Sequence, residues 1–169
     1  MWEKVKVFCE NTSSTIEVEM GTSLLELQSM LNISGPYPML AAYINNRLKE
    51  LNYKIFKPMT VRFIDITHFE GYRVYQRTIS FILQKAVWSL RPETKFYIRH
   101  TVGRGFYCEF ADGVPTDMQL GTLRQRMQEI IDARYPISRH RLLTSEINGI
   151  YEKFGFDDKI ALLNTRKRL

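Results

Sequence analysis

The 169-residue sequence lacks the features that identify several classes of protein. It has two cysteines, Cys9 and Cys108, with no CxxC and no framework of short-spaced pairs, so we expect a reducing, cytoplasmic location. No apolar run approaches the ~18 residues that a membrane-spanning helix needs, so we expect no membrane contact. The first residues, MWEKVKVFCENT, contain no basic segment followed by an apolar run, which excludes a signal peptide.

The motifs of common phosphate and metal sites are also missing. No GxxxxGK[ST] occurs, so the chain has no P-loop. The GxG at 103–105 is too short to identify a phosphate cradle and is more typical of a turn. The histidines, His68, His100 and His140, have no His or Cys three or four residues away, which argues against a zinc site. We therefore expect no metal and no cofactor in this chain.

The sequence does contain enough apolar residues for a core, and it carries an excess of positive charge. Hydrophobic residues make up 44% and charged residues 25%, close to the average of globular proteins. Twenty-four Lys and Arg against eighteen Asp and Glu give a formal charge of +6. Such an excess favours partners such as RNA or nucleotides, although solvated basic faces give the same balance.

Residues 1–67 have the pattern of a small, complete α+β unit. Alternating apolar residues predict strands at 4–10, 15–19, 40–44 and 61–66, with a short strand after the turn-forming Asn45-Asn46. Ser23 and Glu26 have the spacing of a capping box at the start of a helix. The order strand, strand, helix, strand, short strand, strand is that of a β-grasp module.

Residues 68–169 predict a second α+β domain. HFEGYR (68–73) is expected to be the boundary, with Gly71 in a turn, followed by a helix over 74–90. Strands are expected at 95–100 and 106–110, joined by a turn at 101–105. A helix should follow Asp117, a strand is possible over SRHRLL (138–143), and two further helical segments complete the chain, the last being a basic tail.

Arginines at the start of the expected 74–90 helix are the candidate functional residues. Arg73 and Arg77 are one turn apart, and Lys85 follows two turns after Arg77, so the three share a face. Cations at a helix N-terminus oppose the macrodipole, so they need a negative partner. That partner is either an acidic side chain such as Glu70 or a bound anion, which the planar fork of arginine can grip.

The expected hairpin at 95–110 adds two residues to this candidate site. It is the nearest element able to cover the apolar stripe of the helix, so His100 and Arg104 are expected to point toward the same space as Arg77. Arg73, Arg77, Lys85, His100 and Arg104 together form the predicted anion site. A Cys108–His100 nucleophile pair is the catalytic alternative, and a buried, inert Cys108 is the structural one.

Several segments carry a resemblance to known families. GTSLLELQSMLN, LAAYINNRLKELNYKI and TVRFIDIT resemble the TGS domain, a β-grasp module of threonyl-tRNA synthetases and some GTPases. GYRVYQRTISFILQKAVWSLRP, KFYIRHTVGRGFYCEF, LRQRMQEIIDARYPISRHRL and YEKFGFDDKIALL resemble the second additional domain of threonyl- and alanyl-tRNA synthetases. The resemblance implies a TGS-like domain at 1–67 and an incomplete editing-like domain at 68–169.

In the synthetases, the second domain removes serine wrongly attached to threonine tRNA, using an HSxxH-like helix motif and a later Cys and His. Here the helix reads Arg77-Thr78-Ile79-Ser80-Phe81, so both histidine positions are lost. The later Cys–His motif would lie beyond Leu169. The resemblance therefore gives no catalytic residue in this chain, because an Arg–Phe pair cannot bind a metal or act as acid and base.

RTISF together with HTVGRGFYCEF is more similar to bacterial proteins in which these two modules precede a phosphoribulokinase/uridine kinase domain. This implies that the chain is the N-terminal part of an ATP-dependent nucleoside kinase, with the downstream kinase domain as its partner. The favoured function is non-catalytic or regulatory binding of RNA or a nucleotide. An altered aminoacyl-tRNA editing hydrolase and a protein–protein or self-association module are the alternatives.

Overall fold

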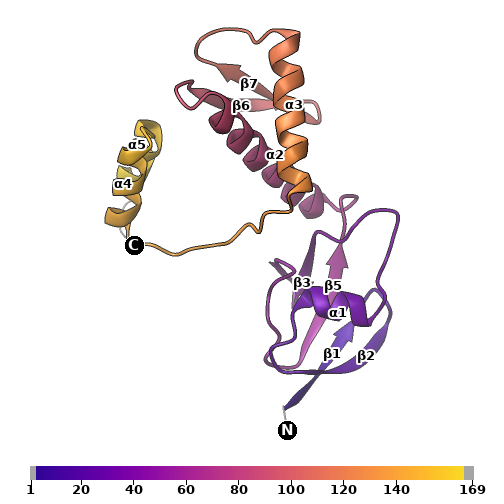
Figure 1. Ribbon diagram of the computed structural model, residues 1–169. Helices are drawn as coiled ribbons and strands as arrows, with labels where there is room; N and C mark the ends of the chain where they lie inside the picture. Colours follow the sequence, from indigo (N-terminus) through magenta and orange to yellow (C-terminus); the bar gives the residue numbers. More distant parts are fainter. Residues whose placement is uncertain (1–2, 166–169) are drawn as a thin grey trace. The chain divides into compact units, whose positions relative to one another are not determined.

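The computed structural model describes residues 3–165 and shows a mixed α+β protein (Figure 1). The described residues form two compact units, one reaching to Ala133 and the other beginning at Arg134. None of their helices is long and apolar enough to cross a membrane. The predicted domain boundary near residue 67 stays a prediction.

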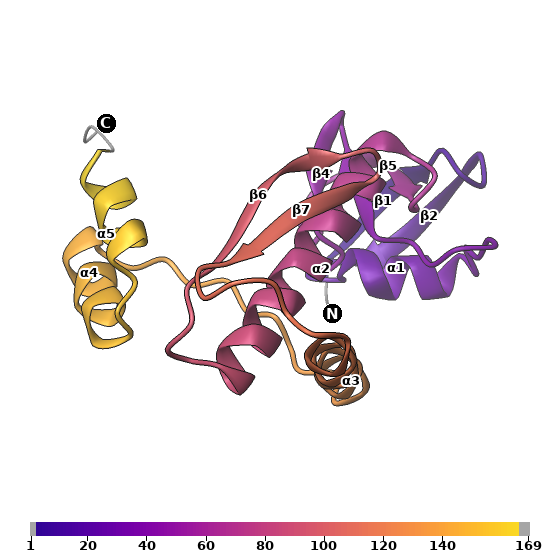
Figure 2. The same ribbon diagram turned by 90° about the horizontal axis from the view of Figure 1, so that it is seen from above.

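A five-stranded mixed sheet forms the first part of the larger unit. Its strands lie in the order β2-β1-β5-β3-β4; β1 and β5 are parallel, and the other neighbours are antiparallel. Helix α1 lies along one face of this sheet (Figure 2). The bounds are β1 Lys4–Cys9, β2 Ser14–Glu19, α1 Leu24–Met30, β3 Ala41–Ile44, β4 Arg47–Lys49 and β5 Met59–Ile64.

Local sequence signals account for this part of the fold. Alternate residues of β1 are buried, as its period-2 pattern predicts. The capping box is confirmed: the Ser23 N–H donates to the Glu26 carboxylate at 2.6 Å, and the Glu26 N–H donates to the Ser23 hydroxyl at 3.2 Å. Asn45 and Asn46 both have positive φ, as predicted for the turn between β3 and β4. The buried apolar cluster runs from Val5 to Phe63.

Helix α2 spans Phe69–Leu90 and begins five residues before its predicted start. The prediction that Gly71 forms a turn at the boundary is therefore wrong. Gly71 is buried in the first turn of the helix, where a Cβ would lie 1.8 Å from the backbone oxygen of Asp65. Glycine stands there because the chain leaving β5 passes against the start of the helix, while the His68 ring accepts from the Glu70 N–H as N-cap.

A hairpin follows α2, formed by β6 (Phe96–Val102) and β7 (Gly105–Phe110), and contacts between β6 and α2 place it beside the helix. Its tip is tied to α2 by the Tyr72 hydroxyl, which donates to the Arg104 carbonyl at 2.6 Å. At its base, Arg91 pairs with Asp112. Helix α3 (Asp117–Asp132) also packs against α2.

The register of the hairpin shifts between Ile98 and His100. Ile98 pairs with Cys108 and His100 pairs with Tyr107, so Arg99 is an extra residue in β6 and forms a β-bulge. Because successive residues of a strand point to opposite faces, the bulge changes the face on which His100 lies.

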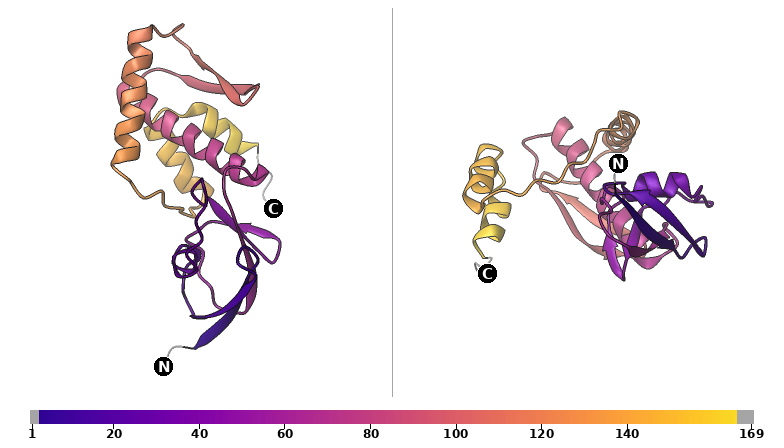
Figure 3. Two further views of the ribbon diagram at one scale, coloured as in Figure 1. Left: turned by 90° about the vertical axis from the view of Figure 1, so that its right-hand side faces the viewer. Right: turned by 90° about the horizontal axis from the view of Figure 1, so that it is seen from below.

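The second unit contains α4 (Thr144–Lys153) and α5 (Asp157–Asn164), which lie side by side (Figure 3). Gly155 ends the first of these helices with a φ of 68°. The possible strand at 138–143 is not formed: these residues are exposed and irregular, and no other strand pairs with them. The predicted basic tail after Thr165 lies outside the described residues.

Candidate functional site

An open groove of about 430 Å³ lies between α2 and the β6–β7 hairpin. Six of its lining residues come from α2, in two rows of residues spaced four apart. Residues at this spacing lie on the same face of a helix. One row carries cations and an aromatic ring, the other amides and a hydroxyl, and the hairpin adds two apolar side chains. The lining residues are Arg73, Arg77 and Phe81; Gln76, Ser80 and Gln84; and Ile98 and Phe106.

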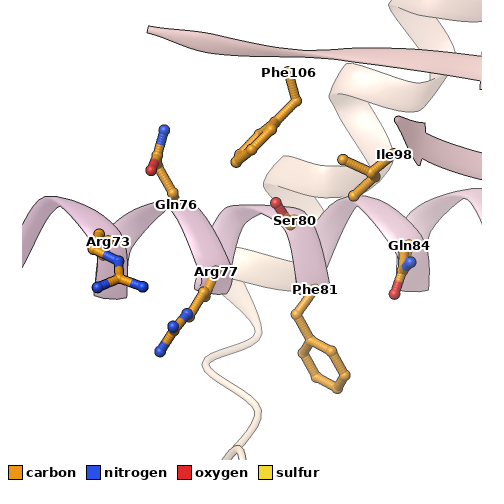
Figure 4. Close-up of a pocket in the computed structure, with 8 residues that line it drawn as sticks. All are labelled: Arg73, Gln76, Arg77, Ser80, Phe81, Gln84, Ile98 and Phe106. Atoms are coloured by element: carbon orange, nitrogen blue, oxygen red, sulfur yellow. The ribbon is translucent and has the colours of Figure 1, made fainter. Parts of the chain in front are cut away.

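The groove has one apolar wall and one charged edge (Figure 4). Phe106 reaches from the hairpin toward Gln76 and Ser80, whereas Arg77 and Phe81 leave the helix on the side away from the hairpin. Arg77 therefore borders the groove at its edge and does not point toward the hairpin. The side chains offer donors to an anion and aromatic surface to a planar group, but no general base.

The two groove arginines differ in their partners. Arg73 pairs with Glu70 at 3.0 Å and lies 5.6 Å from the centre of the Phe69 ring, so the salt-bridge alternative is correct for Arg73. Arg77 is exposed and has neither an ion pair nor a hydrogen bond with any residue of 3–165. The acidic residue of the hairpin strands, Glu109, is paired with Arg99 at 2.7 Å.

The helix macrodipole does not call for an anion at Arg77, contrary to the prediction. Since α2 begins at Phe69, Arg77 lies in the third turn, and the effect of the dipole on a charge falls off within the first turn. The first turn instead carries Glu70, the charge that a helix N-terminus favours. What remains as evidence for a ligand is an unpaired guanidinium at the edge of a groove.

The other predicted site residues lie outside the lining of this groove. Lys85 is exposed on α2, one residue beyond Gln84. The backbone carbonyl of Arg104 is bound to Tyr72. His100 stacks on Tyr107, with ring centres 5.2 Å apart. The bulge at Arg99 is the reason that His100 does not face the helix.

The hairpin register also rules out a Cys108–His100 pair. Cys108 lies opposite Ile98, a groove residue, and alternation puts the neighbouring Tyr107 and its partner His100 on the other face. Burial raises the pKa of the Cys108 thiol, which disfavours the thiolate that a nucleophile requires. Within residues 3–165 no three His, Cys, Asp or Glu side chains gather as a metal site.

The polar row of Gln76, Ser80 and Gln84 and the aromatic wall of Phe106 were not predicted from the sequence. The i, i+4 spacing that linked Arg73 to Arg77 also links these three residues, so the signal for them was present. Nothing local indicated Phe106, because its place in the groove depends on how the hairpin packs.

No family model matches the chain. Among known proteins it is similar to threonine–tRNA ligases: the one from Clostridium kluyveri is 30% identical over 160 residues, which cover 94% of this chain and 25% of that protein. The ligase from Symbiobacterium thermophilum is 27% identical over 152 residues, covering 89% of this chain and 23% of the ligase. The one from Syntrophomonas wolfei is 26% identical over 148 residues, or 87% and 23%.

The chain spans about a quarter of the length of these relatives. Over most of its own length it is therefore a threonyl-tRNA synthetase-like region. The alignment with the Clostridium kluyveri ligase covers 94% of the chain, so it includes residues of both the sheet and the groove.

Proposed function

We propose that the chain is a non-catalytic module that binds RNA or a nucleotide through the groove beside α2. The observation that carries this proposal is Arg77, which is exposed at the edge of the groove with no partner among residues 3–165. Its guanidinium offers a bidentate grip on a phosphate oxygen pair. The formal charge of +6 provides the long-range attraction for such a ligand.

The rest of the lining suits the remaining parts of a nucleotide. Gln76, Gln84 and Ser80 carry donors and acceptors for sugar or base edges. The Phe106 and Phe81 rings offer surfaces on which bases can stack. The similarity to threonine–tRNA ligases is compatible with an RNA ligand.

We extend the proposal to the two parts of the fold and to the parent protein. The sheet with its order β2-β1-β5-β3-β4 and α1 on one face supports a TGS-like β-grasp assignment, and the α2–hairpin part supports an editing-like one. On the resemblance of RTISF and HTVGRGFYCEF, the parent protein is a nucleoside kinase, and this region regulates it or presents its ligand.

Fluorescence anisotropy with a labelled single-stranded RNA at several salt concentrations tests the groove. Arg77→Ala should weaken binding and reduce the slope of log K against log salt by about 0.7, the value for one phosphate contact to a single strand. Arg124→Ala is the matched control, because Arg124 is also a helical, exposed arginine with no partner in the described part of the chain. Equal losses in both variants, or binding indifferent to salt, would contradict the proposal.

An altered editing hydrolase is the second candidate, favoured by the synthetase relatives. Arg77 and Phe81 cannot replace acid–base histidines, and Cys108 and His100 lie on opposite faces of the hairpin. We therefore expect no hydrolysis of seryl- or threonyl-tRNA above the buffer rate in a deacylation assay. Turnover well above buffer that His100→Ala or Cys108→Ala abolishes would make the chain an enzyme.

A further inference from the structure

The bulge in β6 gathers a set of polar and aromatic side chains on the face of the hairpin away from the groove. Ile98 and Phe106 line the groove, so Tyr107 lies on the opposite face, and its partner His100 lies there with it. The His100 and Tyr107 rings stack with an interplanar angle of 29°. In a regular strand His100 would share the face of Ile98 and this pair would not form.

Arg99 joins the same face. Its guanidinium lies 4.3 Å from the centre of the Tyr97 ring, and its Nε donates to the Glu109 carboxylate at 2.7 Å. Tyr97 and Glu109 are cross-strand partners, and Glu109 is two residues from Tyr107. We call these five residues the outer hairpin face: Tyr97, Arg99, His100, Tyr107 and Glu109.

The stacked rings of this face are open to solvent. Tyr107 is 50% exposed and His100 is exposed, as is the Arg99 side chain, whereas Tyr97 is half-buried. Arg104, in the turn, is three residues from Tyr107, or about 10 Å along the strand. Its side chain is exposed and makes no ion pair with any residue in the described range, so a free positive charge lies in the turn, two residue pairs beyond the stacked rings.

A cross-strand aromatic pair stabilises a hairpin by roughly 0.2–1 kcal/mol, but it does not require a bulge. Bulges instead re-aim side chains, often beside functional sites. Strand-borne aromatic rings with a nearby cation are the arrangement on which single-stranded bases stack. We infer that the outer hairpin face binds a nucleobase on the Tyr107–His100 pair, with Arg104 contacting the adjoining phosphate. This site is separate from the groove, whose lining residues it does not share.

The probe is a hexauridylate with one internal 2-aminopurine, whose fluorescence falls on stacking. The full chain should quench it. Tyr107→Leu should weaken binding about tenfold, since one base stack is worth about 1–3 kcal/mol, while Tyr107→Phe keeps both affinity and quenching. Tyr135→Leu removes an even more exposed tyrosine of the second unit, 64% exposed, and should change neither.

The two sites fail independently in this experiment. Arg77→Ala changes the salt dependence if the groove binds phosphate, but it leaves the quenching at saturation unchanged. 2-Aminopurine riboside monophosphate distinguishes the ligand source: quenching by the chain shows that a free nucleotide suffices, and its absence shows that a strand is needed. The inference is overturned if Tyr107→Leu, with an unchanged circular dichroism spectrum, quenches the hexamer like the native chain, or if the native chain does not quench it.

Discussion

The sheet region, β1 to β5, and the groove region, α2 to α3, bury very different amounts of apolar surface. The sheet region has a continuous cluster of buried side chains from Val5 to Phe63. In the groove region only Ala86, Val87 and Ile130 are buried hydrophobic residues of the described chain. Large side chains there, such as Phe81 and Trp88, are exposed to 55% and 40%.

This difference in buried apolar surface assigns stability mainly to the sheet region and ligand binding to the groove region. Burial of apolar surface is the main favourable term in folding, so the sheet region carries most of the free energy of unfolding. Regions with few buried contacts open at lower free-energy cost, and binding segments are drawn from them. Both proposed ligand sites lie in the groove region, where large side chains are exposed to solvent.

The largest effect should come from the sheet core. Leu27 is fully buried in α1, so Leu27→Ala should lower the free energy of unfolding by about 2–5 kcal/mol through lost burial and the cavity it leaves. Phe81→Ala in the groove region removes a larger but mostly exposed side chain and should change it by less than about 0.5 kcal/mol. Urea titration followed by circular dichroism measures both; similar losses would erase the contrast between the regions.

The junction between the two regions should be the next most sensitive place. In Gly71→Ala the new methyl group meets the Asp65 backbone oxygen, so the chain must shift, which we expect to cost about 1–3 kcal/mol. Gly121→Ala in α3 is the matched control. A Cβ there meets nothing within 4 Å, and alanine should stabilise the helix by about 0.4–1 kcal/mol. A neutral Gly71→Ala in a thermal melt would show that the junction is loose.

Residues 1–67 should fold without the rest of the chain. All members of the main buried cluster lie within this range, so truncation removes none of them. Domains of this size are marginal but often stable. We expect a cooperative thermal melt with a midpoint within a few degrees of that of the sheet region in the full chain. A broad, non-cooperative transition would mean that α2 completes the core.

The smallest effect concerns the pH dependence of the sheet region. Hydrogen bonds from the Ser23 N–H and hydroxyl, and then Lys54, hold the pKa of the Glu26 carboxyl below its ordinary value of 4.5. A lowered folded-state pKa contributes stability above pH 4.5 that is lost as the pH falls through the folded value. Thermal melts from pH 6 to 3 should fall less steeply for Glu26→Gln than for the native chain. Parallel curves would remove Glu26 as a cause.

Much of the fold followed from periodicity and caps. The strands of the sheet, the capping box at Ser23 and the hairpin after α2 were all predicted within a few residues, because alternation and turn residues act locally. The start of α2 was not, since glycine at position 71 reads as a helix breaker. Its reason is the neighbouring Asp65 carbonyl, a tertiary contact that local sequence does not display.

The residues of the candidate site also fall into those that local sequence predicted and those that depend on tertiary structure. Helical spacing predicted that Arg73 and Arg77 share a face, and both line the groove. His100 was placed on the wrong face because the bulge at Arg99 depends on the register of the partner strand. The possible strand at 138–143 was also wrong: within residues 3–165 no strand pairs with this segment.

The two ties that join the hairpin to α2 have a mechanical consequence. Tyr72 holds the tip through Arg104, and Arg91 holds the base through Asp112. A hairpin that is held at both ends cannot swing away from the helix as a flap. The part that is left to move is its middle. The middle is where Ile98 faces the groove on one side and His100 meets Tyr107 on the other. A ligand bound on either face of the hairpin would therefore displace the same few residues at its middle.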